Sequence, residues 1–146
     1  MFQRKLGEPI VVGQIEVRFW LESSHTGGSL TSFEFRVPAG ARVPVPHSHD
    51  AFDETIYGIA GTGTWRVGGE SLEVGPGEVL FIPRGVVHGF ANRGATEMHA
   101  LAMVTPGLFG PAYFQDIGRL LNAGGPPDPK AIGDVMRRHG LTPEPG

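Results

Sequence analysis

The chain has 146 residues, a formal net charge of −3 and no cysteine. Its length fits one domain that buries a core without disulfides, and the missing cysteines exclude thiolate metal sites. The mild acidity and the lack of a basic run argue against nucleic acid or an anionic membrane surface as a partner. We expect a cytoplasmic protein, because the sequence shows neither a secretory signal nor ~18 consecutive apolar residues for a transmembrane helix.

Short alternating segments fill the first three quarters of the chain. Residues 14–22 and 30–38 each alternate apolar and polar side chains, as half-buried strands do. A proline-rich connection follows, and six further apolar segments come after it, most of them separated by Gly, Pro or Asn: 54–60, 62–69, 70–74, 78–83, 86–92 and 96–104. Short strands at this spacing predict an all-β sandwich or barrel of eight to ten strands.

The pattern changes to helical spacing after residue 110. Apolar residues recur every three or four positions in 111–122 and again in 128–140, where Asp128 is a candidate N-cap. We therefore predict two short C-terminal helices. Residues 1–109 would form a β-barrel with N-terminal strands, and residues 110–146 a helical extension packed on the same single domain.

A cluster of metal-binding residue types occupies the stretch HSHDAFDE. His47 and His49 are spaced i, i+2, so on a strand both imidazoles point to one face, within reach of one ion. Three acids follow, at Asp50, Asp53 and Glu54, and strand parity cannot rank them because a turn separates them from the histidines. Taken alone, this stretch fits two solvated histidines equally well.

A second histidine region spans residues 77–92. His88 lies on the return strand after a turn at 83–85 and shares a face with Phe90. By itself, His88 also fits a buried histidine whose ring nitrogens are satisfied by the backbone.

Together the two regions resemble the cupin superfamily. Its first motif, G(X)5HXH(X)3,4E(X)6G, is matched by His47, His49, Glu54 and Gly61, while Gly40 lies one residue farther upstream than the motif has it. The second motif, G(X)5PXG(X)2H(X)3N, is matched without a gap by Gly77, Pro83, Gly85, His88 and Asn92. The flanking segments HTGG, FEFRVPAG, VTPG and PAYFQDIGRLL resemble small single-domain cupins of the quercetin 2,3-dioxygenase-like kind.

The resemblance implies a cupin double-stranded β-helix, or jelly-roll β-barrel, that commonly forms a homodimer. It also implies one divalent transition-metal ion, which could be Fe, Mn, Ni, Zn or Cu, held by His47, His49, Glu54 and His88. The family spacing to Gly61 favours Glu54 as the acidic ligand over its acidic neighbours.

Apolar side chains near the histidines suggest a pocket for a small organic molecule. Phe33, Phe35 and Phe90 are candidate substrate-binding residues, although each also fits an ordinary core position. His99 alternates with larger apolar residues on a later strand, and it is a candidate acid or base near the metal or else a satisfied or exposed histidine.

Three kinds of function are compatible with this constellation. The leading hypothesis is a dioxygenase-like oxidoreductase acting on a small, aromatic or otherwise apolar molecule, in which Glu54 can also act as a base. The alternatives are non-redox metal-dependent isomerase, lyase or decarboxylase chemistry, and a non-catalytic metal-containing cupin that binds a small molecule.

Overall fold

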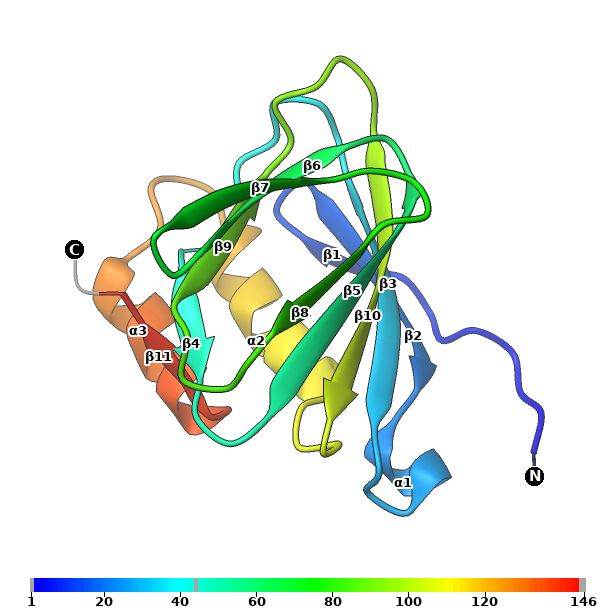
Figure 1. Cartoon of the computed structure of the whole chain (residues 1–146). Helices are drawn as coiled ribbons and strands as arrows, with labels where there is room; N and C mark the ends of the chain where they lie inside the picture. Colours follow the sequence, from blue (N-terminus) through cyan, green and yellow to red (C-terminus); the bar gives the residue numbers. More distant parts are fainter. Residues whose placement is uncertain (1, 44, 145–146) are drawn as a thin grey trace.

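The computed structural model describes residues 2–43 and 45–144, which form two antiparallel sheets facing each other, with the two C-terminal helices at one side (Figure 1). The first sheet has six strands in the spatial order β1 (Ile10–Val12), β2 (Ile15–Leu21), β3 (Thr31–Val37), β10 (Met98–Thr105), β5 (Asp53–Ala60) and β8 (Val79–Ile82). The second has five, in the order β11 (Leu141–Pro143), β4 (His47–His49), β9 (His88–Ala91), β6 (Gly63–Val67) and β7 (Glu70–Val74). The predicted all-β architecture is confirmed.

Three short elements were not predicted: β1, β11 and the single-turn helix α1 (Ser23–Thr26). Two or three alternating residues carry too little pattern to identify a strand. Both short strands are edge strands fixed by tertiary contacts, β1 against β2 and β11 against β4. The described residues therefore contain eleven strands, one more than the upper end of the predicted range.

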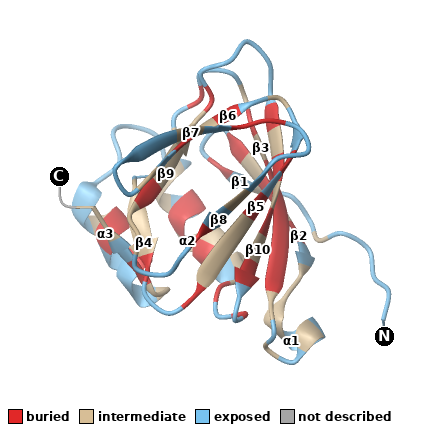
Figure 2. Ribbon diagram, viewed as in Figure 1, coloured by how far each residue is buried: buried red, intermediate tan, exposed pale blue. Residues whose placement is uncertain are grey.

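The core between the sheets depends on pairing large side chains with small ones. Phe33 and Phe35 on β3 lie directly opposite Ala102 and Ala100 on β10. The alanines leave room above the sheet, which the rings fill, and Trp65 from the opposite sheet packs edge-on against Phe35. Figure 2 shows the buried residues concentrated along β3 and β10.

The two predicted C-terminal helices are confirmed as α2 (Pro111–Leu121) and α3 (Pro129–Arg138). The Asp128 side chain accepts a hydrogen bond from the Lys130 N–H at 3.0 Å, as expected of an N-cap. At the end of α2, the Asn122 side chain donates to Val11 O and accepts from Gly13 N, both at 2.8 Å, which ties the helix to the first hairpin. Within the described residues no helix is long and apolar enough to cross a membrane.

Two motif residues have structural roles away from the histidines. Gly61 adopts φ +66°, and a Cβ there would lie 2.2 Å from Glu97 O, so only glycine fits. The buried Asn92 side chain donates to Val37 O and Thr96 O at 2.9 and 2.8 Å and so organises the loop between β9 and β10.

Candidate metal centre

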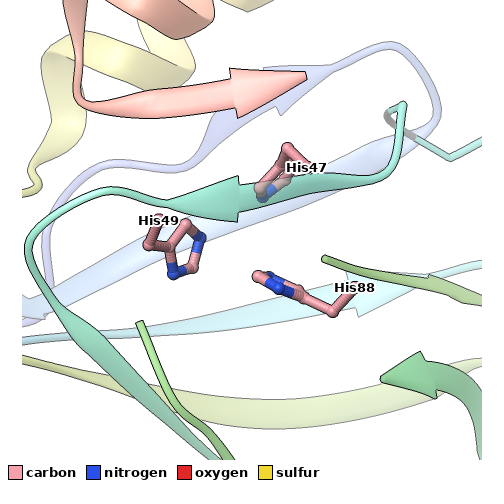
Figure 3. A group of neighbouring side chains, drawn as sticks. All are labelled: His47, His49 and His88. Carbon is pink, nitrogen blue, oxygen red and sulfur yellow. The ribbon is translucent and has the colours of Figure 1, made fainter. Parts of the chain in front are cut away.

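The three histidines of the two sequence regions come together on adjacent strands of the five-stranded sheet. His47 on β4 is the direct cross-strand partner of His88 on β9, and His49 follows two residues later on the same face of β4. One ring nitrogen from each histidine lies within 4.8 Å of the other two. Figure 3 shows the three rings pointing into a common space.

Backbone carbonyls orient two of these rings. His47 Nδ1 lies 2.9 Å from Val45 O, and His88 Nδ1 lies 3.0 Å from Val86 O. Because a carbonyl can only accept, each Nδ1 carries the proton, and Nε2 keeps its lone pair for another partner.

The third ring, His49, is held by packing instead. It stacks on Phe52 with ring centroids 4.5 Å apart, and its Nδ1 is buried without a hydrogen-bond partner among the described residues.

The turn between β8 and β9 fixes the position of His88. Gly85, at φ +81°, donates its N–H to His49 O at 2.8 Å, so the turn rests directly on the strand that carries the other histidines. Arg84 donates its backbone N–H and its guanidinium to Asp53 at 2.9–3.2 Å. Asp53 is therefore engaged in holding this turn, outside the histidine cluster.

Glu54 lies beside the histidines at the start of β5. Its Oε1 is 3.7 Å from His88 Nε2, beyond hydrogen-bond distance, and its side chain is 13% exposed. It is not one of the three donors that lie within 4.8 Å of one another. The remaining acid, Asp50, accepts a hydrogen bond from the Thr142 hydroxyl at 2.7 Å on the exposed side.

Burial controls the protonation of the cluster. Burial, followed by the charge of His88, lowers the pKa of His47 to about 4. Burial also lowers the pKa values of His49 and His88, and the neighbouring imidazoles lower that of His49 further. Burial raises the pKa of Glu54 to about 7. The imidazoles are therefore neutral near pH 7, which is the form that binds metal ions.

The three histidines and Glu54 border a cavity of about 80 Å³, which we call the histidine chamber. The predicted substrate-binding residues Phe33, Phe35 and Phe90 all line it. Sequence reasoning missed several further aromatic residues of its wall, on β6, in α2 and just before α2: Trp65, Phe109, Tyr113 and Phe114. The aromatic-rich segment at the start of α2 was the signal that could have indicated them.

His99, the fourth predicted substrate-binding residue, is placed differently. It alternates with Ala100 and Ala102, which face the interior, so its side chain lies on the outer face of the six-stranded sheet. There its Nε2 is 3.2 Å from Glu34 Oε2, and it does not line the histidine chamber. The predicted role for His99 beside the metal is therefore corrected. His99 instead pairs with Glu34 outside the barrel.

The residues present fit a divalent transition-metal ion. Three neutral imidazoles and one carboxylate form a nitrogen and oxygen donor set, which suits Fe, Mn, Ni, Zn and Cu. The buried, unpartnered nitrogen of His49 and the buried carboxyl of Glu54 are costly in an apolar wall, and a bound ion or its water would compensate both.

Comparison with known proteins agrees with the resemblance to cupins. The cupin domain family matches residues 33–104. Quercetin 2,3-dioxygenase of Bacillus subtilis is 28% identical over 113 residues, which are 77% of this chain and 32% of that protein. The chain thus corresponds to about a third of that relative. The oxalate-binding protein of Thermotoga maritima is 28% identical over 94 residues, 63% of this chain and 76% of that protein.

The fold agrees as well. The solved structure of a predicted oxalate decarboxylase from Thermotoga maritima superposes with a TM-score of 0.62 at 22% identity and covers 68% of this chain and 90% of that one. Both histidine-bearing motifs fall within the matched family region, on the two facing antiparallel sheets described above. The chain belongs to the cupin superfamily.

Proposed function

We propose that this cupin is a metal-dependent, dioxygenase-like oxidoreductase that acts on a small, aromatic or otherwise apolar molecule. The metal, one divalent ion of Fe, Mn, Ni, Zn or Cu, would be held by His47, His49, Glu54 and His88. The observation that carries the proposal is the convergence of three imidazoles beside a buried carboxyl inside an aromatic-lined chamber. The similarity to a quercetin 2,3-dioxygenase supports the dioxygenase-like class.

The protein's contribution begins with orientation. The carbonyls of Val45 and Val86 fix the rings of His47 and His88, and Phe52 fixes His49 by stacking. A bound ion would supply Lewis acidity and, for Fe, Mn, Ni or Cu, a change of oxidation state.

Glu54 has a second role in the proposal. Its carboxyl borders the chamber in which a substrate hydroxyl would lie, and a carboxylate at that position can accept the hydroxyl proton. The proton would then reside on Glu54 Oε1 or Oε2, in a chamber whose wall is largely aromatic.

The chamber wall favours an apolar substrate over a small dianion. Phe33, Phe35 and Phe90 form much of the wall, and no Lys or Arg of the described chain lines it. A volume of about 80 Å³ is roughly half that of the ~150 Å³ cavity that binds benzene, so only a small part of a larger substrate fits inside.

Two alternative functions, a non-redox enzyme and a binding protein, are supported by the names of similar proteins. Relatives named for oxalate binding and for oxalate decarboxylation share this fold or sequence. A non-redox isomerase, lyase or decarboxylase would need the ion only as a Lewis acid, and a non-catalytic cupin would need only the cavity.

We also propose a homodimer that forms through the outer face of the six-stranded sheet. Leu101, Tyr57 and Val79 lie in one row across β10, β5 and β8, and Phe81 lies in the next row. Tyr57, Val79 and Phe81 are 41%, 65% and 55% exposed. Contiguous exposed apolar residues of this kind mark association surfaces.

We further propose a cytoplasmic location, since a chain without cysteine suits a reducing compartment.

Two measurements on protein purified without a histidine tag test the function. Elemental analysis should find close to one equivalent of a transition metal, and oxygen uptake with a panel of phenols, flavonols and diketones should identify a substrate. Less than about a tenth of an equivalent after reconstitution would refute the metal centre. Turnover with Zn and without oxygen would favour the non-redox enzyme, and tight binding without turnover would favour the binding protein.

A further inference from the structure

A second and larger cavity lies against the histidine chamber. Its volume is about 280 Å³, and it shares Val12, Ile15 and Val45 with the chamber wall. Its other side is formed by buried apolar residues of the two C-terminal helices: Ile117, Ile132 and Met136. We call it the helix-side cavity.

The sizes of the two spaces differ in a way that limits what each can hold. An apolar cavity of about 150 Å³ binds benzene, so the helix-side cavity has room for an aromatic ring with a short chain. The histidine chamber, at about 80 Å³, has room for the reacting end only. A molecule with an apolar body that reaches the histidines would therefore occupy both.

The rim of the helix-side cavity carries two polar side chains. Gln14 and Arg42 are both exposed and both line the cavity, and Gln14 Oε1 accepts from the Arg42 backbone N–H at 2.9 Å. Across residues 2–43 and 45–144, the Arg42 guanidinium and the Gln14 amide nitrogen make no hydrogen bond or ion pair with another side chain or backbone atom. Asn122 holds the neighbouring Gly13 through its side-chain oxygen, so this rim is anchored to the end of α2.

We propose that the helix-side cavity is the entrance to the histidine chamber and that it binds an apolar monocarboxylate. The aromatic or aliphatic body lies among the valine, isoleucine and methionine side chains. The carboxylate lies at the surface, where Arg42 can donate two parallel hydrogen bonds to it. This inference names the substrate class of the proposed enzyme and rests on that function for its catalytic meaning, although the binding site itself does not require the metal.

The histidine chamber explains why the carboxylate lies at the rim. Its wall, within the described chain, has no Lys or Arg, so a carboxylate inside the chamber would depend on the metal ion alone. Arg42 is a positive charge that borders the helix-side cavity and not the chamber. A substrate with its acid at Arg42 thus presents its opposite end to the histidines.

Calorimetry with a matched pair of probes tests the site on metal-free and metal-loaded protein. 3-Phenylpropanoate should bind more tightly than 3-phenylpropan-1-ol, which has the same ring and chain without the charge. Arg42→Gln should weaken binding of the carboxylate about two- to fivefold, a modest factor because the guanidinium is exposed, and should leave binding of the alcohol unchanged. Arg93→Gln, at an exposed arginine in the loop after β9, is the matched control and should change neither.

A filling variant tests the cavity independently of charge. Val43 is half-buried on the rim, and Val43→Trp should weaken both probes while circular dichroism stays that of the parent. Equal binding of the two probes to the parent, or an unchanged preference in Arg42→Gln, would overturn the proposed carboxylate site.

The rate at which a chelator removes the metal ion tests whether the helix-side cavity is the entrance to the histidine chamber. In metal-loaded protein, 3-phenylpropanoate should slow removal of the ion by a chelator, and the slowing should fade in Arg42→Gln. An unchanged release rate at saturating probe would show that the cavity is not the entrance. Probe binding by a protein that takes up no transition metal even after reconstitution would refute the proposed enzyme but not this site, whereas metal binding without probe binding would refute this site alone.

Discussion

His47 and His88 face each other as paired residues of β4 and β9, with ring centroids 4.9 Å apart. Each ring is held by a hydrogen bond from Nδ1 to the carbonyl of the residue two positions earlier. Both restraints come from the backbone just before each strand and not from a metal ion. The geometry of the cluster should therefore exist before the ion arrives, so that loss of a ligand weakens metal binding without unfolding the barrel.

The first prediction concerns His88→Ala. It should lower metal affinity at least as much as loss of a residue that merely orients a ligand, which costs about 10–100-fold. Elemental analysis after dialysis against a weak chelator measures the loss, and circular dichroism should show an unchanged strand signal.

His99→Ala is the matched control, because His99 pairs with Glu34 on the outer face of the sheet. It should keep the metal content of the parent. Equal metal contents in His88→Ala and the parent would exclude His88 as a ligand, and loss of the strand signal in His88→Ala would assign it a structural role.

The second prediction ranks two neighbouring acids. Glu54→Gln removes the carboxylate beside His88 and should reduce metal occupancy or turnover. Asp53→Asn weakens a partly exposed pair with Arg84 and should change stability little while the metal is retained. Metal content and urea-unfolding midpoints of both variants separate these effects. If Asp53→Asn lost the metal and Glu54→Gln kept it, the acid would have to be reassigned.

The sequence was informative about the centre because the relevant spacings are short. Two residues from His47 to His49 place both rings on one face, and the family spacing to Gly61 singled out Glu54, whose carboxyl does lie beside His88. Parity alone could not have done this, since a bend at 50–51 separates the two strands. Phe109, in the loop before α2, and Tyr113, in α2, reach the chamber from some sixty residues after the first motif, so no motif spacing points to them, only the aromatic-rich composition of that segment.

His99 is a residue for which the alternation of side chains along a strand predicted the wrong face of the sheet. Its strand carries apolar residues on both faces, with alanines on one and Leu101 and Met103 on the other. The larger side chains suggested the interior face, whereas the interior beside Phe33 and Phe35 requires the small ones. Leu101 and Met103 instead face outward, toward the surface that we propose as the dimer interface.

The third prediction tests that interface. Phe81→Glu places a charge in the outer apolar face and should convert a dimer to a monomer in analytical ultracentrifugation. Leu108→Glu is the matched control, because Leu108 is similarly exposed, at 59%, but lies in the loop before α2. A parent that sediments as a monomer, or a dimer that persists in Phe81→Glu, would contradict the proposed interface.

The fourth prediction concerns the glycine that ends the first motif. Gly61→Ala combines a left-handed φ of +66° with a Cβ 2.2 Å from a backbone oxygen, so it should destabilise the fold by about 2 kcal/mol or more. Gly69→Ala has neither problem, since nothing lies within 4 Å of its Cβ and its φ is not left-handed, and it should stay within about 0.5 kcal/mol of the parent. Urea unfolding followed by tryptophan fluorescence compares them, and equal midpoints would show that the Gly61 backbone can relax.

The last prediction concerns the contact that joins the two C-terminal helices. Asp116 on α2 accepts hydrogen bonds from His139 Nε2 at 2.9 Å and from Arg119 Nη1 at 2.6 Å. These bonds, chiefly that from His139, hold the pKa of Asp116 below its ordinary value of 3.8. A carboxyl with a lowered folded-state pKa stabilises the fold above its unfolded pKa and loses that contribution as the pH falls through its folded pKa. Asp116→Asn should therefore lower the urea midpoint at pH 6–7, and its difference from the parent should shrink only below about pH 3.8. A difference that stayed constant down to pH 3 would mean that Asp116 contributes through packing and not through its charge.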